Sequence, residues 1–278
     1  MLGLRSPHIP PSSGKADPMT DRSLNTDVPS PARIYDLWLG GKDNYEIDRI
    51  VSEQILAAVP DLPVLARTNR EFLGRAVRHM AGEAGIRQFL DIGTGIPTAN
   101  NTHQVAQAVA PDSHVVYVDN DPMVLAHARA LLRAAPEGTT AFIDADLREP
   151  GKILAAAGEF LDFDRPVGLT LLGVVDFLPG TGEAREIIAQ LLAPMAPGSH
   201  LAISHGLVGR QLEEGVRQWN ESGGAPMTLR TLEEVTSFFD GLELLEPGVV
   251  PLPRWRPTPE TLYADREAVY YAGVGRKS

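Results

Sequence analysis

The sequence predicts an α/β fold: a mostly parallel, seven-stranded sheet with helices on both faces and a helical cap formed by the N-terminal part of the chain. Three observations predict it. Short apolar segments alternate with helical segments from residue 88 to residue 204, which is the pattern of parallel strands joined by right-handed crossovers. Acidic residues stand at the ends of three successive predicted strands. Of the 278 residues, 43% are hydrophobic, which supplies a core.

The composition narrows the classes of function. With 25 basic and 36 acidic residues, the formal net charge is −11, which disfavours nucleic acid and anionic membranes and favours a small or cationic partner. The absence of cysteine excludes disulfides, thiolate metal sites and cysteine nucleophiles, and the seven histidines lack metal-ligand spacing. No apolar run approaches the roughly 18 residues that span a bilayer, and the N-terminus lacks the apolar core of a signal peptide. We therefore expect a cytoplasmic protein without a metal site, whose oligomeric state the sequence leaves open.

The N-terminal third precedes the first predicted strand. Residues 1–29 mix Pro, Ser, Gly and charged residues with little periodicity, which predicts a disordered arm. Two helical segments follow, over residues 30–59 with a break at Gly40 and Gly41, and over residues 64–84. We expect residues 30–86 to form the cap and residues 87–278 to form the sheet domain.

Seven strands are predicted in the remainder. Five lie at residues 88–92, 115–119, 140–143, 167–175 and 200–204, with helices between them, including one at 183–192. Beyond them we expect a helix at 211–220, a second helix whose capping box begins at Thr231, and strands at 242–245 and 268–274. We expect the final strand to be antiparallel to the others.

A glycine-rich turn, LDIGTGIPT at residues 90–98, follows the first predicted strand. Gly93 and Gly95 allow the backbone to turn sharply and to approach a ligand closely. An acid before Gly-x-Gly is typical of Rossmann-like S-adenosylmethionine (SAM) sites, because the Asp91 carboxylate attracts the cationic sulfonium and amino group. A dinucleotide turn normally has a third small residue, where this chain has Thr98, and its pyrophosphate would repel Asp91. A purely structural turn is the other alternative. We include Thr94 and Thr98 in the predicted cofactor site.

Acids at the next two strand ends extend the predicted cofactor site. Asp119 and Asn120 end the second strand, where the two carboxylate oxygens suit the two hydroxyls of a ribose. Asp121 precedes a proline and is better interpreted as a helix N-cap. Asp146 follows the third strand, where it is placed to accept from an adenine amino group while Leu147 packs on the ring. A solvent-facing loop aspartate is the alternative for Asp146.

Two titratable residues follow the fourth and fifth predicted strands, at the edge of the sheet where such folds bind ligands. Methyl transfer to a hydroxyl or an ammonium group requires loss of a proton. His205 is the first candidate for the base, because imidazole titrates near neutrality, and Asp176 is the second. A structural role is the alternative for His205, and capping of the following helix is the alternative for Asp176.

These residues resemble the class I SAM-dependent methyltransferases, through Asp91-x-Gly93-x-Gly95, Asp119 and Asp146. A closer similarity links the chain to an actinobacterial S-adenosyl methyltransferase family that began as a domain of unknown function. It covers roughly residues 28 to 275 and rests on the runs 31–45, 69–78, 89–95, 117–122 and 146–148. The resemblance implies the Rossmann-like fold and SAM as cofactor, but no acceptor. Members of that family often have a histidine where this chain has Asp176, which puts the role of that position in doubt.

The N-terminal run of the resemblance contains Gly40 and Gly41, each of which costs about 1 kcal/mol relative to alanine inside a helix. We therefore expect a loop that folds over the cofactor. Lys42 and Asn44 in this loop are assigned to the cofactor site. Tyr35 is a third catalytic candidate, since an aromatic face stabilises a sulfonium.

A second part of the resemblance, residues 69–78, supplies a candidate partner for the methionine carboxylate of SAM. Asn69 or Arg70 is placed to reach it, Arg70 with two parallel hydrogen bonds. The large apolar residues Leu37 and Trp38 are interpreted as core.

Together the motifs predict a SAM-dependent methyltransferase that methylates oxygen or nitrogen of a small molecule whose identity the sequence does not give. Two alternatives are a SAM-binding protein without catalysis and a nicotinamide-dependent oxidoreductase. Asp91 and Thr98 disfavour the oxidoreductase.

Overall fold

The structure is a computed structural model that describes residues 25–131, 136–259, 261, 263 and 269–278. The predicted disordered arm lies outside the described residues up to residue 24. Its last part, residues 25–29, lies against the first helix, since the Arg33 guanidinium donates to the backbone oxygens of Asn25 (3.2 Å) and Val28 (2.5 Å).

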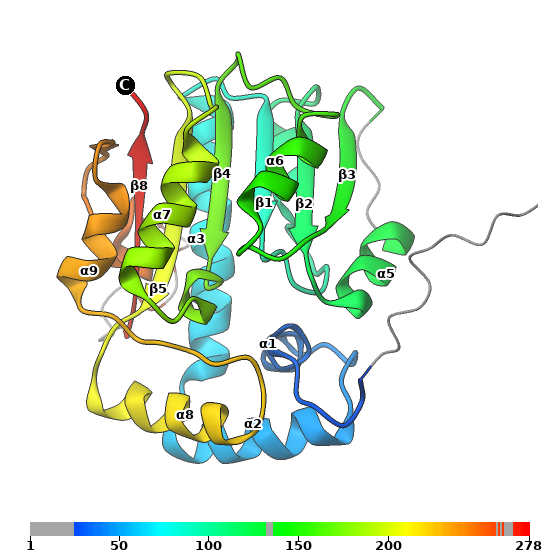
Figure 1. The fold of residues 1–278 in the computed structure, drawn as a ribbon, viewed down its shortest axis with the longest axis vertical. Helices are drawn as coiled ribbons and strands as arrows, with labels where there is room; N and C mark the ends of the chain where they lie inside the picture. The colour runs from blue at the N-terminus through cyan, green and yellow to red at the C-terminus, as the bar shows by residue number, and fades with distance from the viewer. Residues whose placement is uncertain (1–24, 132–135, 260, 262, 264–268) are drawn as a thin grey trace, which may run out of the picture.

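Within the described residues the sheet has eight strands, seven of them in the order β3-β2-β1-β4-β5-β8-β6 (Figure 1). Strands β1 to β5 are parallel, and β8 is antiparallel to β5, β6 and β7, so the final strand is antiparallel as predicted. The strands are β1 Gln88–Ile92, β2 His114–Asp119, β3 Thr139–Asp144, β4 Val167–Leu172, β5 His200–Gly206, β6 Glu243–Leu244, β7 Val250–Pro251 and β8 Tyr270–Arg276.

Two strands differ from the prediction. β4 ends at Leu172 instead of residue 175, because Gly173 adopts a positive φ of 68° and Val175–Phe177 form a 3₁₀ turn. β7, which pairs with β8, was not predicted, since it is only two residues long and contains a proline. Of the predicted strand at 268–274, residue 268 lies outside the described residues.

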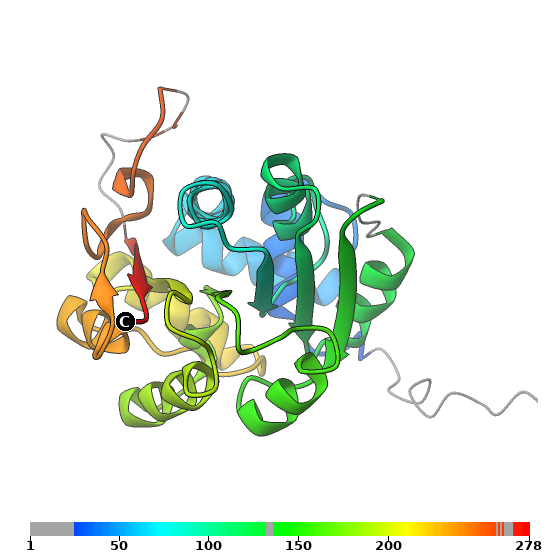
Figure 2. The same ribbon diagram turned by 90° about the horizontal axis from the view of Figure 1, so that it is seen from above.

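Helices cover both faces of the sheet, as Figure 2 shows. One face carries α3 (Leu62–Gly82) and α4 (Thr102–Val109), whose apolar side chains pack on Phe89 and Val115. The other carries α6 (Pro150–Ala157), α7 (Thr181–Leu192) and α9 (Leu232–Thr236), which pack on Leu90, Val116 and Leu169. Successive residues of β1 and β2 thus face opposite layers, as the two-residue period of a strand requires. α5 (Pro122–Leu131) lies beside β3.

A helical cap lies beyond the carboxyl ends of the parallel strands (Figure 1). It consists of α1 (Pro31–Leu39), α2 (Glu46–Ala58) and α8 (Arg210–Glu221). α8 approaches α2 closely at Gly215, where a Cβ would lie 2.7 Å from Val59 Cγ2. The arrangement differs from the predicted division at residue 86: α3 runs along the sheet, and α8 joins the cap from later in the chain.

Among the described residues, no helix combines the length and the apolar character that crossing a membrane requires.

Candidate functional site

A cavity of about 430 Å³ lies between the carboxyl ends of β1, β2 and β4 and the cap. Ten of the predicted site residues line it: Tyr35, Arg70, Asp91, Gly93, Thr94, Gly95, Asp119, Asn120, Asp146 and Leu147. Five do not: Lys42, Asn44, Thr98, Asp176 and His205. The cavity therefore brings together predicted residues from five separate parts of the chain.

The glycine turn forms one wall. Gly93 and Gly95 have φ values of 73° and 66°, in the left-handed region that favours glycine. Gly93 N donates to Val118 O at 2.9 Å, which joins the turn to the end of β2. A Cβ on Gly93 would collide with Val174, so the turn packs closely on the chain after β4.

Asp119 bridges this turn and the loop after β2. Its Oδ2 accepts from Gly95 N at 2.9 Å and its Oδ1 accepts from Asp121 N at 3.0 Å. Burial raises the pKa of Asp119 to about 6, against the opposing effect of these backbone donors. Each carboxylate oxygen keeps one lone pair for a further donor.

The Asp91 carboxylate is held by two hydroxyl groups. Thr102 Oγ1 donates to Oδ2 and Thr170 Oγ1 donates to Oδ1, both at 2.6 Å. Burial raises the pKa of Asp91, and the two threonine hydrogen bonds oppose that rise. Sequence reasoning missed both threonines, which lie on α4 and β4 and approach Asp91 only in the folded chain.

Asp146 forms a compact polar group with two neighbours. Arg148 binds both of its oxygens, Nε at 2.9 Å and Nη2 at 2.6 Å, and Asn120 Nδ2 donates to Oδ2 at 2.9 Å. These hydrogen bonds, chiefly those of Arg148, lower the pKa of Asp146 to about 2. Arg148, which also lines the cavity, was not among the predicted site residues.

Arg70 fixes the loop before α4. Its Nη2 donates to Ala99 O (3.1 Å), Asn100 O (3.0 Å) and Asn101 Oδ1 (3.2 Å). Thr98 belongs to the same loop, since its N–H donates to Asn101 Oδ1 at 3.1 Å, and it does not line the cavity. Arg70 Nε is buried and has no partner among the described residues. One donor of this lining residue is therefore left without a partner in the described part of the chain.

The Gly40–Gly41 loop does not carry Lys42 and Asn44 into the cavity. Gly40 ends α1 at a φ of 91°, and Gly41 has no room for a side chain beside the Asp36 carboxylate. Lys42 is exposed, and Asn44 Oδ1 accepts from Arg49 at 2.9 Å. The break in the helix was predicted correctly, but the loop directs these two side chains elsewhere.

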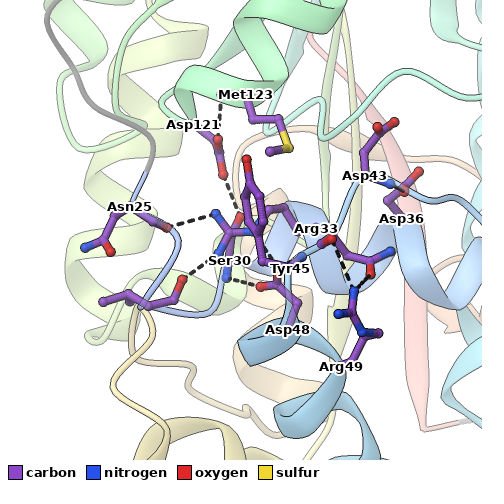
Figure 3. A network of polar contacts seen from close by, with 12 residues as sticks. Asn25, Ser30, Arg33, Asp36, Asp43, Tyr45, Asp48, Arg49, Asp121 and Met123 are labelled. Atoms are coloured by element: carbon purple, nitrogen blue, oxygen red, sulfur yellow. Dashed lines mark hydrogen bonds and ion pairs between the residues drawn. The ribbon is translucent and has the colours of Figure 1, made fainter.

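A buried network attaches the cap to the sheet domain (Figure 3). Asp48 on α2 pairs with Arg33 Nε at 2.6 Å and accepts from the N–H groups of Ser30 (3.0 Å) and Tyr45 (2.8 Å). Ser30 Oγ donates to Asp121 Oδ2 at 2.5 Å. The other oxygen of Asp121 accepts from Met123 N at 2.8 Å, consistent with the N-cap interpretation.

The cap end of the cavity is mostly apolar. Among the described lining residues the charged ones surround the glycine turn and the ends of β2 and β3, and none comes from α1, α2 or α8. The apolar wall includes Trp38, Leu65, Phe177, Val216, Trp219 and Met227. Trp38, interpreted from the sequence as core, therefore also borders the cavity.

Three polar side chains lie among these apolar groups. Tyr35 Oη donates to Ala66 O at 2.9 Å and accepts from Asn69 Nδ2 at 3.2 Å. Asn69 Oδ1 accepts from Ser204 Oγ at 2.8 Å. The third is Tyr270 on β8, which the sequence analysis assigned only to a strand. Burial raises the pKa of both tyrosines.

His205 and Asp176 lie behind the cavity wall, and both are fully buried. Arg230 Nη1 donates to His205 Nε2 at 2.7 Å, and His205 Nδ1 contacts Gly206 O at 2.7 Å. Both ring nitrogens are therefore occupied, and burial lowers the pKa of His205. This placement does not support the prediction of His205, or of Asp176, as the base that touches an acceptor.

Comparison with protein families gives a match over residues 17–278 to a family described as S-adenosyl methyltransferase. The chain belongs to the S-adenosyl methyltransferase family. It is therefore a SAM-dependent methyltransferase with SAM as cofactor, as the glycine turn and the acids at the strand ends predicted.

Solved structures support the assignment. This methyltransferase is 44% identical to a DUF574 family protein from Streptomyces avermitilis, with a TM-score of 0.88, and the match covers 92% of this chain and all of that one. A protein from Thermobifida fusca is 40% identical, with a TM-score of 0.84 and coverage of 92% and 98%. Both organisms agree with the actinobacterial resemblance. A comparison with curated proteins found no match.

More distant structures share the fold of this methyltransferase. Magnesium protoporphyrin IX methyltransferase from Synechocystis, crystallised with S-adenosylhomocysteine (SAH), is 12% identical with a TM-score of 0.51, over 88% of this chain and 93% of that one. The predicted Rossmann-like fold is confirmed.

Proposed function

We propose that this methyltransferase transfers the methyl group of SAM to a hydroxyl or an amino group of a small, predominantly apolar molecule. The observation that carries the proposal is the uneven distribution of charge in the cavity. Charged side chains gather at the glycine turn and the strand ends, and the cap end has aromatic and aliphatic walls. A cationic, polar cofactor suits the first part, and an uncharged acceptor suits the second.

Residues around the glycine turn fit SAM. The Asp119 oxygens have lone pairs for two ribose hydroxyls, and the adenine is assigned to Asp146 and Leu147. Arg70, a cationic residue of the cavity lining, is assigned to the methionine carboxylate. The tight turn at Gly93 leaves its backbone close to the ligand. SAM supplies an electrophilic methyl group on a sulfonium.

The cap is assigned to the acceptor. Helices α1, α2 and α8 enclose the apolar end, so an acceptor there is removed from water and held near the strand ends. Alignment of two reactants in this way supplies several kcal/mol of rate acceleration. A cavity of about 430 Å³ shared with the cofactor leaves room for a small molecule, and an enclosed apolar wall disfavours a nucleic acid strand.

The test begins with calorimetric titration of SAM and SAH, with NAD and NADP as controls. We expect micromolar affinity for the first pair alone. The protein is then incubated with SAM and a panel of neutral phenols and amines matched with their carboxylated analogues, and SAH formation is measured. Methylation of carboxylated analogues in preference to neutral ones would contradict the proposed acceptor class.

A further inference from the structure

The two tyrosine hydroxyls at the apolar end of the cavity donate to different kinds of acceptor. The Tyr35 hydroxyl donates to a backbone carbonyl, that of Ala66, and accepts from Asn69. A carbonyl oxygen cannot take up a proton, so Tyr35 cannot pass one on. The Tyr270 hydroxyl instead donates to a carboxylate, Asp176 Oδ1, at 3.3 Å.

Asp176 sits directly behind Tyr270. It is fully buried, its Oδ1 also accepts from Gly206 N at 3.0 Å, and its Oδ2 has no partner among the described residues. It follows β4, whereas Tyr270 opens β8, where it is paired with Gly206 at the end of β5. The two side chains thus connect the cavity to a buried acceptor of protons.

A neighbouring cation compensates the charge of this carboxylate. A guanidinium has only donors, so the Arg230 Nη1 contact of 2.7 Å requires His205 Nε2 to accept and places the ring proton on Nδ1. That nitrogen lies 3.4 Å from Asp176 Oδ1. The same nitrogen contacts Gly206 O at 2.7 Å, so His205 lies between Arg230 and Asp176, two groups of opposite charge that attract one another.

We propose that Tyr270 is a catalytic residue that receives the proton of a neutral hydroxyl acceptor and, in the same event, passes its own proton to Asp176. Asp176 is the terminal base, and His205 and Arg230 are positioning residues. This inference rests on the proposed function and narrows it from hydroxyl or amine acceptors to hydroxyl acceptors.

The step balances. A bond forms between the acceptor oxygen and the methyl carbon while the bond from that carbon to sulfur breaks, and the sulfonium becomes a neutral thioether. The acceptor proton moves to Tyr270 Oη and the Tyr270 proton moves to Asp176 Oδ1. One positive charge on sulfur and one negative charge on Asp176 disappear together. Since burial raises the pKa of Tyr270, the tyrosine conducts the proton as a neutral group.

The test uses 4-nitrophenol, whose phenolate absorbs at longer wavelength than the phenol, and nitrobenzene, which lacks the hydroxyl. Both are titrated into the SAH-saturated full-length protein. In the wild type we expect 4-nitrophenol to bind at least about fivefold more tightly than nitrobenzene, the value of one hydrogen bond. In Tyr270→Phe the two affinities should agree within about twofold. Tyr271→Phe, the next residue on the same strand, is the matched control and should keep the preference, since Tyr271 does not line the cavity.

A second readout follows the proton. Bound 4-nitrophenol should carry a larger phenolate fraction in the wild type than in Asp176→Asn at the same pH, because an amide cannot accept the proton. Equal phenolate fractions, no hydroxyl preference in the wild type, or an unchanged preference in Tyr270→Phe would overturn the inference. If Asp176→Asn does not fold, the Tyr270→Phe comparison alone decides.

The SAH titration separates this inference from the proposed function. If the wild-type protein does not bind SAH, the proposed function itself is wrong. Normal SAH binding in the wild type, Tyr270→Phe and Tyr271→Phe, together with no effect on 4-nitrophenol, would remove only the assignment of Tyr270 and Asp176.

Discussion

At the scale of single residues, Asp119 both binds the backbone of two loops and is assigned to the ribose of the cofactor. It fixes the glycine turn through Gly95 N and the loop after β2 through Asp121 N, and it retains the lone pairs that a ribose requires. Asp91 has a different environment, since two threonine hydroxyls already hold its oxygens. Equivalent sequence signals at two strand ends thus lead to different hydrogen bonding.

The first prediction concerns Asp119→Ala. Loss of both ribose hydrogen bonds should weaken SAH binding by about 1 to 3 kcal/mol in calorimetric titration. Asp164→Ala, in an exposed loop before β4, is the control and should bind as the wild type does. Equal affinity of Asp119→Ala and wild type would remove the ribose assignment.

The second prediction is a pH dependence. Because the pKa of Asp119 is about 6 in the free protein, its carboxyl must lose a proton before it accepts two ribose hydroxyls. SAH affinity should therefore rise between about pH 5 and pH 7, by at most about tenfold per pH unit. The effect on stability has the opposite sign: the folded state holds this proton when the unfolded state has released it, so raising the pH from 3.8 to about 6 lowers the free energy of unfolding. A pH profile of SAH affinity in Asp119→Asn should be flatter; a profile as steep as that of the wild type would assign the titration to another group.

At the scale of elements, the cap depends on a few polar anchors. α1 and α2 are joined by the Arg33–Asp48 pair, whose side chains are 4% and 0% exposed, and Ser30 links this pair to Asp121. The helices were predictable from the sequence, but the pairing of Arg33 with Asp48 and the hydrogen bond from Ser30 to Asp121 were not. The network therefore joins α1 and α2 of the cap to Asp121, the residue before α5.

The third prediction tests that anchor. Asp48→Asn leaves the buried Arg33 guanidinium without a counter-charge, which should lower the free energy of unfolding by about 3 to 5 kcal/mol in urea titration. Glu53→Gln, exposed on the same helix, should change it by less than about 0.5 kcal/mol. A similar decrease in the free energy of unfolding in both variants would show that the network in Figure 3 does not stabilise the fold more than an exposed side chain does.

At the scale of the whole molecule, the cavity is the junction between the sheet domain and the cap. Its lining comes from α1, α2, α3, α8, the carboxyl ends of β1 to β4 and the start of β8, so a ligand there contacts parts of the chain that meet only in the folded state. Such a ligand binds the folded protein and not the unfolded one, and mass action stabilises the fold.

The fourth prediction follows. SAH at about 100 times its dissociation constant should add about 2.7 kcal/mol to the free energy of unfolding and raise the melting temperature with concentration. At the same SAH concentration Asp119→Ala should gain less than the wild type, and NAD should have no effect on either. Stabilisation by NAD equal to that by SAH would contradict the cofactor assignment.

Much of the fold was predictable because its signals are local. The apolar strands β1, β2, β3 and β5 were located to within one or two residues, since alternation with helices and turn residues marks their ends. β7 was missed because two residues carry no periodicity. The cap boundary differed because its third helix, α8, comes from a distant part of the sequence.

The candidate site also has a part that was predictable from local sequence signals and a part that was not. The glycine turn and the acids at the carboxyl ends of β1, β2 and β3 were predictable from the sequence, because parallel strands place these ends at one edge of the sheet. Which side chains reach the cavity depends on the folded chain. Arg148 and Tyr270 line it, whereas five predicted residues do not: Lys42, Asn44, Thr98, Asp176 and His205. The physical reason is that the direction of a side chain depends on loop geometry and on long-range packing, and neither leaves a periodic pattern in the sequence.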